Sequence, residues 1–345
     1  MTALSVAVLV IAAAATVATA LAVFPLLKRA GVVDVPSDRS SHSEVTVRGG
    51  GIAIGCGVTV ATVVATVWSF VENGAFGFGG ILVSVGFLVL TWCYSVIGMS
   101  DDLDSLQPLG RLFGQVALAL IFSGCIALVS THGLGHVLVF AVVGVTIVNA
   151  VNFVDGLNGY VTGWAIVTGS WYAFVSAWVG QEDVMLLALA LAGAACGFLP
   201  FNIGRARAFL GDTGSYGIGA AVFAIAVWLF VSGVPIVVVI APLVFVFFDV
   251  GCTLMWRLFQ GENVFLPHRQ HMYQRTQQAG WSHGMVSLFH AALTVLACLL
   301  AVPTLIAGNT VTTYPAHVFW VALLALYALV PLWLRRRPAP QAVAA

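Results

Sequence analysis

Charged residues are scarce in this sequence. Asp, Glu, Lys and Arg together make up 8% of the 345 residues, and hydrophobic residues make up 61%. A soluble globular protein carries charges on about a quarter of its residues, so that class of protein is excluded. The formal net charge is zero, and neither a zinc-finger nor a helix-turn-helix pattern occurs, which argues against nucleic acid as a partner.

Cysteine is also sparse, and the cysteines are not spaced as in disulfide frameworks or zinc sites. The six cysteines lie far apart in hydrophobic segments, and no Cys-x-x-Cys pair occurs. Disulfide frameworks and zinc sites depend on paired spacings, so neither is expected, and we interpret the cysteines as buried thiols.

What the sequence has instead is a series of hydrophobic segments, most of them about 20 residues long, the length that crosses a bilayer as a helix. A membrane β-barrel would show short alternating strands. We therefore predict an all-α, polytopic integral membrane protein that forms a single domain. The eleven candidate transmembrane segments are residues 3–26, 50–71, 80–98, 112–130, 136–152, 161–179, 184–199, 214–232, 234–255, 283–303 and 316–334.

The basic residues predict the orientation. With eleven spans, all 13 Lys and Arg residues lie on one face of the membrane. By the positive-inside rule this face is cytoplasmic, so the N-terminus is outside and the C-terminus is cytoplasmic. Lys28 and Arg29 follow the first segment and no basic residue precedes it, so we expect a retained span rather than a signal peptide. Residues 335–345 are predicted to be a basic, disordered tail.

Most acidic residues fall on this same face, in short motifs at segment ends. Asp101 and Asp102 end the third segment in the string D-D-L-D. Adjacent carboxylates repel each other unless they share a cation or a proton. A divalent metal, a substrate cation or a role as a base is therefore expected here, and a solvated acidic loop is the alternative.

Residues 149–159, N-A-V-N-F-V-D-G-L-N-G, place amides and a carboxylate at the end of the fifth segment. Asn149, Asn152 and Asp155 are spaced i, i+3, i+6, so we expect them along one side of the helix, facing a polar cleft. Polar groups are costly in hydrocarbon, which favours a functional site. The alternative is a plain helix end followed by a Gly-rich turn.

The connection between the seventh and eighth segments carries Asn202 and Arg205 and then a G-D-T-G-S turn. A helix N-terminus with free backbone N–H groups attracts phosphate. Asp212 in this turn is expected either to cap the helix or to hold a metal ion.

Two further clusters are basic. In the loop 256–282, His268, Arg269 and His271 supply cationic donors that suit a diphosphate, with a metal site as the weaker alternative. In the first loop, Arg48 precedes three glycines. This pattern fits backbone packing against an anionic ligand, and equally a simple helix start beside topogenic charge.

Carboxylates and basic groups are thus predicted to meet at the cytoplasmic boundary. Carboxylate oxygens bind Mg²⁺, and basic groups neutralise phosphate oxygens. Phosphoryl transfer needs this combination. The location suits one water-soluble phosphorylated substrate and one membrane-bound substrate.

Taken in order, these motifs resemble those of the polyprenyl-phosphate N-acetylhexosamine-1-phosphate transferases of glycosyltransferase family 4. The matching strings are D-D-L-D, N-A-V-N-F-V-D-G-L-N-G, F-N with G-D-T-G-S, and H-R-Q-H. R-S-S-H and R-G-G-G in the first loop are similar to the bacterial branch that initiates O-antigen and related glycans. The resemblance covers about residues 28–290.

The resemblance implies that an N-acetylhexosamine 1-phosphate passes from a UDP-amino sugar, of the GlcNAc type, to undecaprenyl phosphate with release of UMP. This is the first membrane step of a cell-surface glycan. It implies Mg²⁺ as the cofactor, with Mn²⁺ as an alternative. It also implies a multi-pass protein of the bacterial inner membrane whose active site faces the cytoplasm. The identity of the donor sugar and homodimerisation through an apolar helix face are left open.

Residue roles follow from the same resemblance. Asp101 and Asp102 match paired aspartates implicated in catalysis or in activating the lipid phosphate. Asp212 matches a metal-binding aspartate. Asn152 and Asp155 match a motif on the nucleotide and metal side, which implies catalytic and metal-binding roles for Asp155.

His268, Arg269 and His271 match a histidine-containing loop that contacts the donor's diphosphate. The loop reads H-R-Q-H-M-Y rather than as a run of histidines, which argues against the branch that transfers phospho-MurNAc-pentapeptide. Asn158 stands where many members have a second aspartate, so no base or ligand role is carried over to it. The other residues assigned to substrate binding are Asn149, Asn152, Asn202, Arg205 and Arg48.

The sequence leaves two questions open. Direct attack of the lipid phosphate on the sugar-bound phosphorus is favoured, but a covalent aspartyl-phosphate route with Asp102 as the nucleophile fits the same residues.

A non-enzymatic transporter or lipid flippase is the alternative from another class, and its polar groups would lie near the bilayer midplane. Here they gather at one face, with Asp249 as the main exception, which favours the enzyme.

Overall fold

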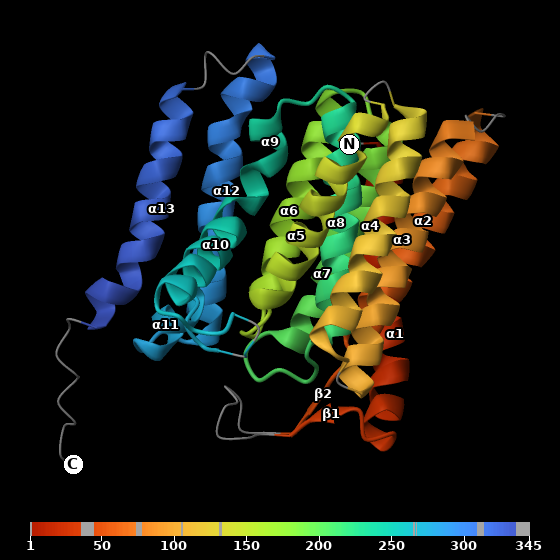
Figure 1. The fold of residues 1–345 in the computed structure, drawn as a ribbon. Helices are drawn as coiled ribbons and strands as arrows, with labels where there is room; N and C mark the ends of the chain where they lie inside the picture. Colours follow the sequence, from red (N-terminus) through yellow and green to blue (C-terminus); the bar gives the residue numbers. More distant parts are fainter. Residues whose placement is uncertain are drawn as a thin grey trace.

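The fold is a bundle of long helices that run side by side (Figure 1). The computed structural model describes residues 2–35, 45–73, 78–104, 106–130, 133–264, 266, 268–308 and 314–335. The long helices are α1 (Ala3–Arg29), α2 (Gly51–Asn73), α3 (Phe78–Leu103), α4 (Pro108–Val129), α5 (Val137–Phe153), α6 (Tyr160–Trp178), α7 (Glu182–Asn202), α8 (Gly211–Val231), α10 (Val244–Phe259), α12 (His283–Ala307) and α13 (Tyr314–Arg335). The shorter elements are β1 (Val33–Asp34), β2 (Thr46–Val47), η1 (Leu134–His136), α9 (Ile236–Ile240), η2 (Ala241–Leu243) and α11 (Met272–Gln278).

In the described part of the chain, nine helical segments are long and apolar enough to cross a membrane. They confirm the predicted all-α, multi-pass membrane protein. Ten of the eleven predicted segments each coincide with one helix, but two of these helices, α6 and α13, fall outside the nine. α6 contains Tyr, Thr, Ser and Gly among its apolar residues, and the apolar part of α13 is the shorter stretch Val318–Leu334. The number of crossings and the orientation of the termini therefore stay predictions.

The predicted segment 234–255 is not one continuous helix. It consists of α9 and α10 joined by the 3₁₀ turn η2, which contains Pro242. Proline has no backbone N–H and disrupts the preceding helical turn, which accounts for the break. The first-loop string at 39–42, Pro267 and the predicted tail beyond Arg335 lie outside the described residues.

The centre of the bundle is formed by α7 and α8. In these two helices 78% and 83% of the membrane-spanning stretch is buried, against 22% in α1. Glycine and alanine are frequent in α8, and small residues let neighbouring helices approach closely. Helices α2, α3 and α5 pack around α8, so the start of α8 is surrounded by the ends of other segments.

Two glycines bring the neighbouring backbones against the start of α8. A Cβ atom at Gly51 would lie 2.2 Å from the Cα of Gly214, and a Cβ atom at Gly98 would lie 2.2 Å from the carbonyl oxygen of Asp212. Gly51, the third glycine after Arg48, therefore packs against protein backbone, which fits the predicted alternative of a simple helix start better than that of an anionic ligand. Its role is to place α2 next to α8.

We expect Gly51→Ala to lower the free energy of unfolding by about 1–3 kcal/mol, because the added methyl group has no room between α2 and α8. Gly124→Ala is a matched control, since Gly124 is also helical and no atom lies within 4 Å of a Cβ built there. Thermal unfolding in detergent measures both variants. Equal melting temperatures for the two would contradict this packing role.

A short hairpin holds the first loop in place. Val33 of β1 pairs with Val47 of β2, and the carbonyl oxygen of Val47 accepts a hydrogen bond from the backbone N–H of Phe209 at 2.8 Å. The hairpin and α11 lie at the same end of the bundle (Figure 1). The segments that follow α1 and α7 are thus joined, which brings Arg48 to the start of α8.

Candidate active site

A polar cleft of about 320 Å³ lies at this end of the bundle. Its walls come from β1, the residue after β2, the α5–α6 turn, the end of α7, the start of α8 and the α11 region. The cleft collects five of the predicted site residues, namely Arg48, Asp155, Asn202, Asp212 and Arg269. It also contains Asn158 and two polar residues to which the sequence assigned no site role of their own, Asp34 and Gln274.

Asp212 lies in the first turn of α8 and faces the cleft. The side-chain amide of Asn152 donates to its Oδ1 at 2.9 Å and to Ser215 Oγ at 3.0 Å. Asn152, from α5, therefore orients the Asp212 carboxylate, which agrees with the predicted meeting of these two motifs.

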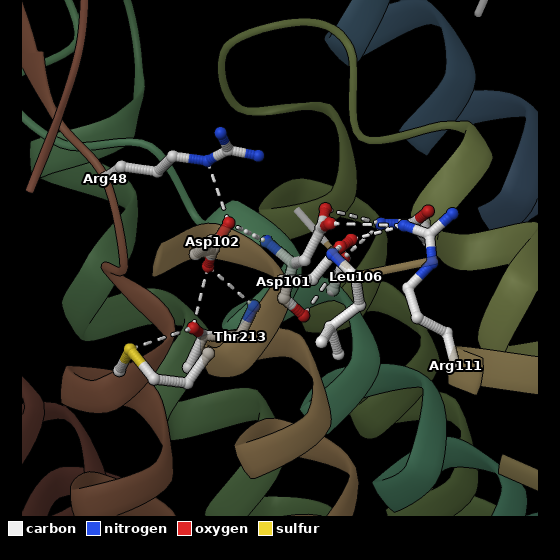
Figure 2. A network of polar contacts seen from close by, with 10 residues as sticks. Arg48, Asp101, Asp102, Leu106, Arg111 and Thr213 are labelled. Atoms are coloured by element: carbon white, nitrogen blue, oxygen red, sulfur yellow. Dashed lines mark hydrogen bonds and ion pairs between the residues drawn. The ribbon is translucent and has the colours of Figure 1, made fainter. Parts of the chain in front are cut away.

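Asp102 caps α8 from the neighbouring helix α3 (Figure 2). Its side chain is fully buried. Oδ1 accepts from the backbone N–H of Asp212 at 2.9 Å and from Arg48 Nε at 2.8 Å. Oδ2 accepts from the backbone N–H of Thr213 at 2.9 Å and from its hydroxyl at 2.7 Å. All the strong acceptor positions of this carboxylate are thus used within the protein.

The contacts of Asp102 correct one expectation. The start of α8 was predicted to offer free backbone N–H groups to a phosphate, but those of Asp212 and Thr213 are already bonded to Asp102. The physical reason is that a helix N-terminus favours a carboxylate. Here that carboxylate belongs to Asp102 of α3, which lies 110 residues before Asp212 in the chain.

Asp101 is paired with Arg111 of α4, an ion pair drawn in Figure 2. Asp101 Oδ1 also accepts from the backbone N–H of Leu106 at 2.8 Å. Arg111 Nη1 lies 3.9 Å from Asp212 Oδ2, so this arginine faces carboxylates from both α3 and α8. In the sequence Arg111 is predicted only to be one of the topogenic basic residues, and no spacing links it to Asp212.

Asp155 follows α5 and lines the cleft. Its carboxylate has no hydrogen-bond or ion-pair partner among the described residues. Burial raises the pKa of Asp155 well above its usual range, and the negative charges of Asp212 and Asp102 raise it further. A carboxyl group in such surroundings needs a proton or a cation.

Asn149, Asn152 and Asp155 were expected to face one cleft from the same side of α5, but Asn149 contacts a different part of the protein. Asn149 lies outside the cleft lining and donates to Gln115 Oε1 of α4 at 2.6 Å and to the carbonyl oxygen of Val145 at 2.8 Å. Asn149 lies one helical turn before Asn152, further from the end of α5, and Asp155 lies beyond that end, so the three side chains meet different partners. Asn149 therefore joins α5 to α4.

Asn202 lines the cleft but is occupied by internal contacts. Its Oδ1 accepts from the backbone N–H of Gly159 and from Thr162 Oγ1, both at 2.9 Å. Its side-chain amide donates to the carbonyl oxygen of Ala208 at 3.1 Å. Asn202 thus ties the α5–α6 turn to the 203–210 segment, and Arg205 in that segment is exposed and outside the cleft lining.

The histidine-containing loop contributes Arg269 to the cleft, not its histidines. His271 is buried, with Nδ1 3.0 Å from Asp249 Oδ1. Burial, together with the neighbouring His271 and Arg257, lowers the pKa of His268 to about 4. The neutral form of the His268 ring is thus favoured near pH 7 in this structure, and contact with the donor's diphosphate stays a prediction for this residue.

No group of three or more His, Cys, Asp or Glu side chains is arranged to hold a metal ion within the ranges that the structure describes. The carboxylates closest to such a role are those of Asp155 and Asp212, which share the cleft. Any divalent ion there would need oxygen ligands from water or substrate in addition.

Known proteins share this sequence pattern. The profile of glycosyl transferase family 4 matches residues 84–230. The chain is 27% identical to a probable undecaprenyl-phosphate N-acetylglucosaminyl 1-phosphate transferase of Bacillus subtilis, over 80% of this chain and 79% of the relative. It is 28% identical to a decaprenyl-phosphate N-acetylglucosaminephosphotransferase of Mycobacterium tuberculosis, over 76% and 73%. It is 30% identical to a phospho-N-acetylmuramoyl-pentapeptide-transferase of Moorella thermoacetica, over 61% and 73%. The chain therefore belongs to the polyprenyl-phosphate N-acetylhexosamine-1-phosphate transferases of glycosyl transferase family 4.

Proposed function

We propose that this protein transfers an N-acetylhexosamine 1-phosphate from a UDP-amino sugar to undecaprenyl phosphate and releases UMP. The observation that carries the proposal is the cleft at the end of the helix bundle. There, Arg48 and Arg269 lie in one lining with the carboxylates of Asp155 and Asp212. Arginines bind phosphate oxygens, and carboxylates hold a divalent ion that binds the same oxygens.

The relatives favour a donor of the UDP-GlcNAc type. The match to the Bacillus subtilis protein named for N-acetylglucosamine covers 80% of this chain. The match to the Moorella protein named for phospho-N-acetylmuramoyl-pentapeptide covers 61% of this chain.

We further propose that the cleft faces the cytoplasm of a bacterium and that the product begins a cell-surface glycan such as an O-antigen. A homodimer stays a prediction.

Mg²⁺ is the cofactor that we propose, with Mn²⁺ as an alternative. Mg²⁺ is commonly bound through one or two carboxylates, substrate phosphates and water rather than by a cage of protein ligands. The residues fit this mode, because Asp155 has no side-chain partner among the described residues and shares the cleft with Asp212. When bound, the ion would neutralise charge on the diphosphate.

The proposed reaction is a direct displacement. A phosphate oxygen of the lipid attacks the phosphorus bonded to the sugar, and the bond from that phosphorus to the bridging oxygen breaks, so UMP leaves with this oxygen. Arg48 and Arg269 orient the diphosphate and neutralise its charge. We propose that Asp102 positions α8 and Arg48 rather than attacking phosphorus, because its four hydrogen bonds and complete burial hold it away from a substrate.

The test is an assay of the purified protein with undecaprenyl phosphate and a panel of UDP-sugars, in which UMP release is measured. Release with a UDP-N-acetylhexosamine and formation of the lipid-linked diphosphate would support the proposal. If no sugar in the panel gives UMP, the proposed transferase activity is wrong, and a transporter or lipid flippase becomes the favoured function.

We expect removal of divalent ions with EDTA to abolish UMP release, because the carboxylates and diphosphate would then repel one another. Addition of excess Mg²⁺ or Mn²⁺ should restore the rate. EDTA already saturated with Mg²⁺ is the matched control. Full activity in excess free EDTA would contradict the metal requirement.

A further inference from the structure

Asp249 is the centre of a buried hydrogen-bond network, and it does not belong to the cleft lining. It lies in α10, and none of its surface is exposed. Oδ1 lies 3.0 Å from His271 Nδ1 and accepts from the backbone N–H of Met272 at 2.9 Å. Oδ2 accepts from the backbone N–H of Tyr273 at 3.1 Å and from the hydroxyl of Tyr327 at 2.6 Å. Asp249 thus caps the start of α11 in the way that Asp102 caps α8.

The position of α11 matters because α11 adjoins the cleft. Gln274 of α11 lines the cleft, and Arg269 lies just before this helix. The hydroxyl of Tyr273 donates to the carbonyl oxygen of Phe153 at 3.1 Å. A Cβ atom at Gly156 would lie 2.3 Å from that hydroxyl oxygen, so α11 packs directly against the turn that carries Asp155.

Tyr327 connects this arrangement to α13. It is buried, with only 1% of its surface exposed, and its ring lies 5.6 Å from that of Phe245. Its hydroxyl lies 3.2 Å from that of Tyr160, and because the Tyr327 O–H donates to Asp249, the Tyr160 hydroxyl is the donor in this pair. The Tyr327 bond to Asp249 is the shortest of the contacts that this carboxylate makes.

We propose that Tyr327 is a positioning residue for the part of the cleft that holds the nucleotide diphosphate. Its hydrogen bond fixes Asp249, Asp249 fixes the start of α11, and α11 sets where Arg269 and Gln274 lie. The residue acts from α13, a helix that contributes no residue to the cleft lining within the described chain. This inference rests on the proposed function for the identity of the substrate.

A first experiment needs no activity. Hydrogen exchange of the intact protein in detergent is measured by mass spectrometry for peptides covering 268–278. We expect Tyr327→Phe to speed the exchange of the Met272 and Tyr273 amides by about tenfold, because the carboxylate that accepts them loses a fixed partner. Tyr172→Phe is the matched control, since it deletes a buried tyrosine hydroxyl that donates to the carbonyl oxygen of Val239 at 2.8 Å.

The control separates positioning from a general loss of stability. Faster exchange in Tyr327→Phe alone supports the proposal. Equal exchange in this peptide for the wild type and Tyr327→Phe, or an equal increase in Tyr172→Phe, would overturn it. This result stands even if the wild-type protein releases no UMP, so failure of the positioning role and failure of the proposed function are distinguishable.

A second experiment uses turnover. For Tyr327→Phe we expect the KM for the UDP-sugar to rise about tenfold, the effect of losing one hydrogen bond to a charged group. The KM for undecaprenyl phosphate and kcat should stay within about twofold, because the cap of α8 is untouched. A fall in kcat with both KM values unchanged would refute a role in donor positioning.

Discussion

Asp212→Asn is expected to lower the rate of UMP release by at least about 10²–10³-fold, the range seen when one strong electrostatic contact to the transition state is lost. Asparagine has nearly the same shape, and the backbone N–H at this position would still bond to Asp102. The substitution therefore removes negative charge from the cleft without removing the cap of α8. Activity should not return at higher Mg²⁺ concentration if the ligand itself is lost.

Asp104→Asn is the control for Asp212→Asn. Asp104 lies just beyond the end of α3, is exposed and does not line the cleft, so the same chemical change there should leave the rate within about twofold. Expression and melting temperature of both variants are measured beside UMP release. Near-normal turnover in Asp212→Asn would remove this residue from the metal site.

Asp102→Ala is expected to have the largest effect on stability. It leaves two backbone N–H groups of α8 and the guanidinium of Arg48 without their acceptor. A lost cap and unpaired donors together cost about 2–3 kcal/mol, a figure that allows for the partial exposure of Arg48. For a chain of 345 residues the melting temperature in detergent should fall by about 3–4 °C.

Asp102→Asn distinguishes a capping role from a nucleophilic one. Asparagine caps helices about as well as aspartate does, and its one acceptor oxygen can still bond one of the two backbone N–H groups, so the fold should survive. An amide cannot form an aspartyl-phosphate, so a nucleophilic role predicts complete loss of UMP release. We expect about a tenth of the wild-type rate or more to remain. A variant that melts like the wild type but shows no turnover would restore the covalent route.

The helices were predictable because the lengths and compositions of the hydrophobic segments are local properties. Ten of the eleven predicted segments each coincide with one helix, and the break at Pro242 shows where the remaining segment divides into α9 and α10. The membrane environment makes this step reliable, since a spanning segment must satisfy its own backbone.

The roles of individual site residues were harder to predict, because they depend on pairs that lie far apart in the chain. Asp155 and Asp212 were identified from their charge beside apolar segments, and both line the cleft. The capping role of Asp102 could not be predicted, because its partners in α8 lie 110 and 111 residues later in the chain. The spacing of residues in the sequence does not indicate that Arg111 pairs with Asp101, or that burial lowers the pKa of His268.

The cap on α8 also has a consequence for how the protein is made. Asp102 is synthesised 110 residues before the backbone N–H of Asp212 that it will hold. At about 5–20 residues per second, the ribosome needs about 5–20 s to deliver that partner. During this interval Arg48 is the one of these partners that is already present, so the cap of α8 cannot form until Asp212 and Thr213 have been synthesised. The nascent chain therefore completes its cleft late, and Tyr327, 78 residues beyond Asp249, is among the last residues to arrive.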